Sequence, residues 1–116
     1  MQSRAQAKWI RMSPRKVRRV VDQIRGKKAG EAVDMLLFMP YKAAKPVWKV
    51  LNSAMYNLIH SDKHPISRDE AEQMVIVEAF ADQGPTLPRR FRARARGRAM
   101  PILKRTSHIT LTISDV

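Results

Sequence analysis

The chain has 116 residues, 44% of them hydrophobic, which is enough for one domain with a modest core. It carries 23 lysines and arginines against 10 acids, and this net charge of +13 indicates a polyanionic partner, most often nucleic acid. No cysteine is present, which excludes disulfides and thiolate metal sites, and no apolar run approaches the roughly 20 residues of a membrane span.

The first predicted element is a short strand at Lys8–Met12, with Trp9 as its apolar anchor. Ser13 and Pro14 then predict the start of a helix, because serine caps a helix N-terminus and proline fits its first position. This helix is expected to reach about Arg25 and to stop at Gly26. Its apolar face follows the spacing i, i+3, i+4, i+7, through Val17, Val20, Val21 and Ile24. The opposite face is basic, with Arg15, Lys16, Arg18, Arg19 and Arg25, and a basic turn follows at Lys27 and Lys28.

Two further helices are expected. A short one at Glu31–Met39, ended by Pro40, is apolar nearly all round and therefore predicted to be centrally buried. The other covers roughly Lys42–His60, where Pro46 is tolerable only in the first turn or at a kink. Trp48 lies off its apolar stripe and either packs on the sheet or stacks on a base; we favour packing. This third helix carries a second basic patch, Lys42, Lys45 and Lys49.

Residues 61–73 read as a polar connection, and two strands follow at Met74–Asp82 and Thr106–Ser114. The second strand alternates Ile109, Leu111 and Ile113 with polar residues, the pattern of a half-buried antiparallel strand. The predicted fold is α+β, with three helices packed on a small antiparallel sheet, in a single domain of residues 1–116.

Between those strands, residues 84–105 hold eight basic residues and no acid, and we predict a long basic β-hairpin extension, the hairpin arm. Arginines stand at every second position from Arg90 to Arg98, so an extended chain would project them from one face. A two-stranded ribbon is marginal in water. The arm is therefore expected to insert into folded RNA and to be ordered there. A disordered, solvated segment is the alternative, and the strands that hold both ends weigh against it.

Catalysis and metal binding have little support in this sequence. His60 and His64 have i, i+4 spacing, but Pro65 follows and no third ligand is evident. Asp69, Glu70 and Glu72 lie in a polar connection without an apolar pocket to shift their pKa values. We predict neither an enzyme nor a metal or cofactor site.

Several motifs together resemble a known family. They are RMSPRKVR at Arg11–Arg18, IRGK at Ile24–Lys27, KVLNSA at Lys49–Ala54, GPTL at Gly84–Leu87, RARGRA at Arg94–Ala99 and KRTSHIT at Lys104–Thr110. In this order, and over nearly the whole chain, they resemble large-subunit ribosomal protein twenty-two of the bacterial type.

The resemblance implies a structural constituent of the large ribosomal subunit. It implies binding to large-subunit ribosomal RNA (rRNA) of the bacterial 23S type, help in its assembly, and an arm that lines the nascent-peptide exit tunnel. Implied partners are this RNA, neighbouring large-subunit proteins and the nascent polypeptide, with no membrane and no homo-oligomer. The implied location is the cytoplasm, with plastid or mitochondrial ribosomes as the alternative.

The residues predicted to bind rRNA fall into two groups. Those of the body are Lys8, Arg11, Ser13, Arg15, Lys16, Arg18, Arg19, Arg25, Lys27, Lys28, Lys42, Lys45 and Lys49. Those of the arm and its root, some also lining the tunnel, are Arg89, Arg90, Arg92, Arg94, Arg96, Gly97, Arg98, Lys104, Arg105, Thr106, Ser107 and His108. The strongest rival interpretation is a nucleoid-type DNA-bending protein, which also presents basic β-arms but acts as an obligate dimer.

Overall fold

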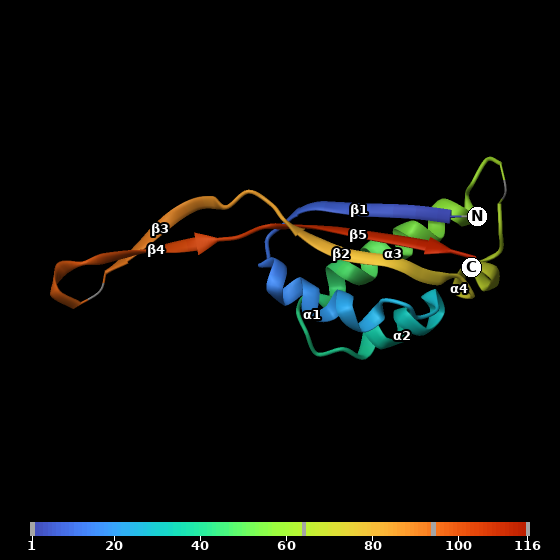
Figure 1. Cartoon of the computed structure of the whole chain (residues 1–116), viewed down its shortest axis with the longest axis horizontal. Coiled ribbons are helices and arrows are strands. Elements are labelled where there is room, and N and C mark those ends of the chain that lie inside the picture. Colours follow the sequence, from blue (N-terminus) through green and yellow to red (C-terminus); the bar gives the residue numbers. More distant parts are fainter. Residues whose placement is uncertain (1, 64, 94, 116) are drawn as a thin grey trace.

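The structure, a computed structural model, describes residues 2–63, 65–93 and 95–115, and for residues 87–93 and 99–103 it describes the backbone alone. The helices and strands, in chain order, are β1 Gln2–Ile10, α1 Pro14–Ile24, α2 Ala29–Phe38, α3 Ala44–Ile59, α4 Arg68–Glu72, β2 Val75–Gln83, β3 Leu87–Ala93, a 3₁₀ turn Ala95–Gly97, β4 Ala99–Lys104 and β5 Ser107–Ser114. The predicted α+β class is confirmed: helices pack on a three-stranded antiparallel sheet, and a hairpin extends from it (Figure 1).

The sheet has the order β1-β5-β2, so the last strand of the chain is its central strand. The prediction that β5 is half-buried is wrong, because Thr110 and Thr112 are only 2% and 1% exposed on the face away from the core. Neighbouring strands cover these threonines. Gln6 Nε2 donates to Thr110 Oγ1 at 3.4 Å, and Thr112 Oγ1 donates to Glu78 Oε2 at 3.4 Å.

Strand β1 was predicted too short and with the wrong role for its tryptophan. It begins at Gln2 and pairs with β5 over most of its length, and Trp9 is 63% exposed, so it is not a core anchor. The inward residues of β1 are the small Ser3, Ala5 and Ala7, which allow α3 to pack close to the sheet. Ser3 Oγ donates to the carbonyl of Ala54 on α3 at 2.8 Å.

Helix α1 agrees with the prediction. Ser13 caps it by accepting from the amide of Lys16, Pro14 occupies the first turn, and the chain leaves the helix through Gly26 at φ +84°. The four residues of the predicted apolar face are fully buried: Val17, Val20, Val21 and Ile24. Its contacts with β2, together with those of α3 with β1 and β5, close the core on one face of the sheet.

Helix α2 is less buried than predicted. Ala29, Ala32 and Leu36 face the core, but Leu37 and Phe38 are 59% and 88% exposed. An apolar composition all round the helix could not show which side meets α3 and α4, and only one side does.

Helix α3 accommodates Pro46 in its first turn, as one of the two predicted alternatives required. Trp48 packs partly buried against the core, which confirms the favoured interpretation. The polar connection contains a helix that the sequence did not reveal, the five-residue α4, which Ser67 caps by accepting from the amide of Glu70.

The hairpin arm is a separate two-stranded sheet, β3-β4. Figure 1 shows it leaving one end of the body, which is the remainder of the chain, while α4 lies at the other end. The radius of gyration is 17.3 Å, against about 13 Å for a compact domain of this length, and the longest dimension is 63 Å. The prediction that an extended strand projects the alternating arginines from one face does not hold as far as Arg98. The strand ends at Ala93, and Arg96 and Gly97 turn the chain with φ of +62° and +72°.

Candidate nucleic-acid interface

Hydrogen bonds hold the two strands of the arm's root together and join the root to the body. The amide of Gly84 donates to the carbonyl of Thr106 at 2.9 Å, and Thr106 Oγ1 donates to the carbonyl of Pro85 at 2.6 Å. Ser107 Oγ donates to the carbonyl of Met12 at 3.1 Å, which ties the root to the segment before α1. Thr106 and Ser107 are at most 1% exposed, so the structure gives these two predicted site residues an internal, positioning role.

This fastening creates a cleft of about 820 Å³ between the start of α1, the segment before α3 and the root of the arm. Its cations come from three separate parts of the sequence. The residues that line it are Arg11, Met12, Ser13, Lys16, Arg19, Tyr41, Lys42, Ala43, Lys104 and Arg105. We call it the basic cleft. Six of its ten residues are cations, and all six were among the predicted RNA-binding residues.

No acid lines the basic cleft, and none of its six cations forms an ion pair with a described carboxylate. The N-terminus of α1 opens into it through Ser13, so the helix dipole adds to the positive potential. Tyr41 was not predicted: its ring lies 5.0 Å from the guanidinium carbon of Arg19 and fixes that side chain by a cation–π contact. Such a cleft can bind phosphate groups but not distinguish bases.

Two other predicted cations have partners inside the protein. Arg18 Nε donates to the carbonyl of Ala81 at 2.9 Å, and Arg25 Nε donates to the carbonyl of Ala79 at 3.0 Å. Arg25 also forms an ion pair with Asp22 at 3.0 Å. Both carbonyls belong to β2, an edge strand, so these arginines satisfy groups that would otherwise be open to pairing with another chain.

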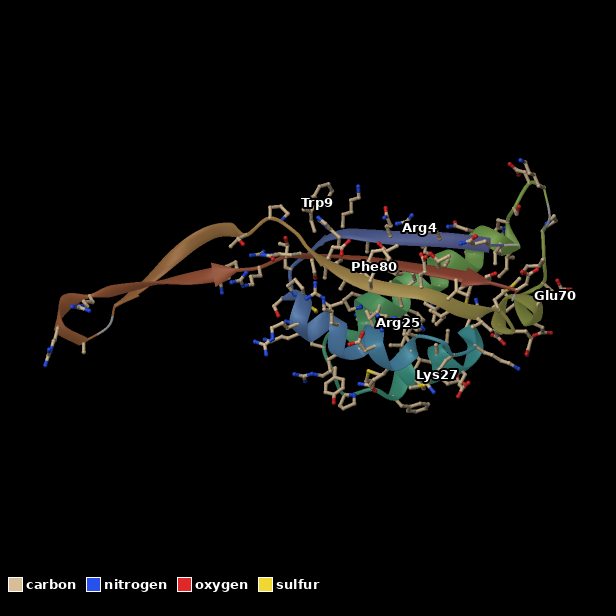
Figure 2. All side chains as sticks on the ribbon, in the orientation of Figure 1. Arg4, Trp9, Arg25, Lys27, Glu70 and Phe80 are labelled. Carbon is tan, nitrogen blue, oxygen red and sulfur yellow. The ribbon has the colours of Figure 1, made fainter. Side chains whose placement is uncertain are left out.

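The remaining predicted body residues lie outside the basic cleft. Lys8 places Nζ 5.9 Å from the centre of the Trp9 ring, and Lys28 Nζ donates to Gln73 Oε1 at 3.3 Å. Lys27 lies near the opposite end of α1 from the cleft (Figure 2). The other three are exposed on helices: Arg15, Lys45 and Lys49.

In the arm, the turn holds Arg96, Gly97 and Arg98, all exposed. Gly97 suits its positive φ, and a Cβ there would meet no atom within 4 Å, so the tip is open. Three predicted arginines lie on β3, whose backbone alone is described: Arg89, Arg90 and Arg92. Arg94 lies outside the described residues.

The model of the ribosomal protein L22p/L17e family matches residues 5–114. The chain belongs to this family. Similar proteins include three named "Large ribosomal subunit protein uL22". That of Synechococcus sp. (strain JA-3-3Ab) is 51% identical over 97% of this chain and 87% of its own length. The relative from Thermosynechococcus vestitus is 52% identical over the same shares, and that from Acaryochloris marina 53% over 95% and 87%.

Membership of the L22p/L17e family confirms the resemblance found in the sequence, and it makes the chain a structural, non-enzymatic protein. It also decides against the nucleoid-type rival. The three carboxylates of the polar connection are surface residues. Asp69 and Glu70 occupy the first turn of α4, and Glu72 Oε1 forms an ion pair with Arg68 Nε at 3.4 Å.

His60 follows the end of α3 and stacks on Tyr56 with ring centres 5.8 Å apart, while His64 lies outside the described residues. In the part of the chain that the structure describes, no three histidines or acids are placed to hold a metal ion. None of the described helices is long and apolar enough to cross a membrane.

Proposed function

We propose that this protein is a component of the large ribosomal subunit that binds rRNA of the bacterial 23S type through the basic cleft and the hairpin arm. The observation that carries the proposal is the convergence of six cations from three distant segments, without a described acid among them. Scattered surface lysines serve solubility wherever they lie. Cations held around a concave site, beside a helix N-terminus, instead fit an anion of defined shape.

In this proposal the cleft holds the phosphate backbone of the RNA. Arginine offers paired donors in a plane that match two phosphate oxygens, so Arg11, Arg19 and Arg105 would orient the strand, while Lys16, Lys42 and Lys104 would act as point charges. Since phosphate contacts carry no base identity, the cleft would select RNA by the path of its backbone.

The arm would work differently, because it has almost no means to hold its own shape. A hairpin of two strands is marginal by itself, and β3 and β4 pair only with each other. Walls of RNA would neutralise its arginines and order it. By touching RNA on both sides the arm would join separate RNA segments, which supports a role in assembly. The open tip at Arg96–Arg98 would line the exit tunnel and meet the nascent polypeptide.

Charge along the molecule supports one orientation in the particle. The arm and the basic cleft occupy one end, whereas Asp69, Glu70 and Glu72 cluster on α4 at the other, where Figure 2 labels Glu70. RNA attracts the first end and repels the second. The arm would therefore point into the subunit, and the α4 end would face solvent or neighbouring ribosomal proteins.

The proposed location is the ribosome of the cytoplasm, with a monomeric protein and no membrane contact. Plastid and mitochondrial ribosomes remain the alternatives. The cyanobacterial relatives are compatible with the cytoplasm and with plastids. Localisation of a tagged full-length chain separates these compartments.

The test is reconstitution with the full chain. When it is mixed with bacterial large-subunit rRNA and the other large-subunit proteins, it should sediment with the particle on a sucrose gradient at a ratio of one per particle. A photo-crosslinker placed at Arg96 should then capture a stalled nascent chain. Sedimentation apart from the particle would overturn rRNA binding. Incorporation with crosslinks to RNA but never to nascent chains would overturn tunnel lining alone.

A further inference from the structure

Trp9 is placed in a conformation that its side chain does not favour. Its φ is +56°, in the left-handed region that bulky residues rarely adopt. The register between β1 and β5 shifts between Ala7 and Ile10, so Trp9 lies in a β-bulge. The amide of Trp9 donates to Nδ1 of His108 at 3.1 Å, which holds the bulge in place. Bulges of this kind commonly re-aim a side chain.

The bulge turns a large apolar ring into solvent. Trp9 is 63% exposed, and its side chain points away from the helices, at the end of the body where the arm begins (Figure 2). Its contact with His108 is edge-to-face, with ring centres 5.8 Å apart and planes at 90°. An edge-to-face contact steadies a ring without burying it as a stacked partner would. The strained backbone of Trp9 thus keeps this ring exposed.

The surroundings of Trp9 favour a nucleic-acid base over an apolar protein surface. Lys8 Nζ is 5.9 Å from the ring centre, and Arg11, two residues along the chain, lines the basic cleft. On the same outward face of β1 stand Arg4 and Gln6. Of the other exposed large apolar residues, Tyr41 already holds Arg19 in the basic cleft, and Leu37, Phe38, Tyr56 and Val77 lie on other elements. An exposed aromatic ring beside cations is the arrangement that stacks bases while nearby charges hold their phosphates.

We propose that Trp9 is a stacking platform for one unpaired base of the bound RNA, next to the phosphate path through the basic cleft. This inference rests on the proposed RNA binding and deepens it. A duplex exposes base faces only at its ends, so the base must come from a loop, a bulge or a strand end. His108, by fixing the backbone of Trp9, is a positioning residue for this platform.

The test uses the fluorescence of Trp9. The chain has two tryptophans, so the W48F variant leaves Trp9 as the single reporter. Bacterial large-subunit rRNA should quench it on binding, because a stacked base shields the indole. Heparin, a polyanion without bases, should bind and leave the emission nearly unchanged. Equal quenching by heparin and RNA would overturn the stacking proposal.

Affinity gives an independent measurement. W9A should weaken rRNA binding about 5- to 150-fold with an unchanged dependence on salt, because stacking releases no counterions. W9F should lose much less. W9G is the decisive variant, because glycine accepts the positive φ, so the body folds without strain while the ring is gone. If W9G, with normal circular dichroism, binds rRNA as tightly as wild type, Trp9 is no platform. If wild type itself does not bind rRNA, the proposed function fails instead.

Discussion

The basic cleft makes a quantitative prediction about salt. Replacing Arg11 and Lys42 by glutamine removes two of its six cations, and neither side chain has a described ion-pair partner that would be lost. If the six cations meet six phosphates of duplex RNA, they contribute a slope of about −5 to the plot of log K against log[salt], and each lost contact removes about one unit.

The same counterion argument gives the loss of affinity. At 0.15 M salt one released counterion corresponds to about a fivefold change in K, so the double variant should bind rRNA about 30-fold more weakly. Fluorescence anisotropy of a labelled rRNA fragment, titrated at several salt concentrations, measures both quantities. Folding stability should stay within about 0.5 kcal/mol of wild type, since both positions are on the surface.

The matched control replaces Lys63 and Arg68 by glutamine, which makes the same change in net charge with exposed residues that neither line the cleft nor lie beside Trp9. The control should keep nearly the wild-type slope. Equal losses in the two double variants would mean that RNA senses only net charge, and the basic cleft would then have no special role. An unchanged slope after the cleft substitutions would refute the phosphate assignment directly.

Replacing Leu87–Lys104 by a turn of about four residues should leave the body folded and raise its free energy of unfolding by about 1–2 kcal/mol, because a shorter loop costs less entropy to close. The same variant should bind rRNA more weakly. Loss of native circular dichroism would show that the arm is part of the core. Gly84→Ala would place a Cβ 2.5 Å from Thr106 Oγ1 and 3.1 Å from the His108 ring, and should cost about 1–3 kcal/mol in urea denaturation because Thr106 is buried; an unchanged midpoint would contradict this packing. Ser13→Ala removes the cap of α1 and should cost about 1 kcal/mol, while Ser13→Gly should cost only a few tenths; equal losses in the two would mean that the hydroxyl is not the source.

The sequence predicted helix α1 well because the signals for it are local. A capping serine, a proline in the first turn and a spacing of four apolar residues act within a few positions of one another, and no distant contact was needed to interpret them. Strand β1 was predicted poorly for the opposite reason. Its inward residues Ser3, Ala5 and Ala7 are small, so the period of two is present but carries almost no hydrophobic contrast. A search for small residues alternating with polar ones would have found it.

The sequence by itself determined which cations are available to the site and that they outnumber the acids. Only the tertiary structure decided which of them act together. Arg11, Lys42 and Lys104 are far apart in the chain, and they share one cleft because β5 pairs between β1 and β2 and brings the arm's root beside the start of α1. The same folding turned Arg18 and Arg25 onto the edge of β2 and Trp9 outward. Local sequence specifies what each side chain can bind, whereas long-range strand pairing specifies where that side chain points.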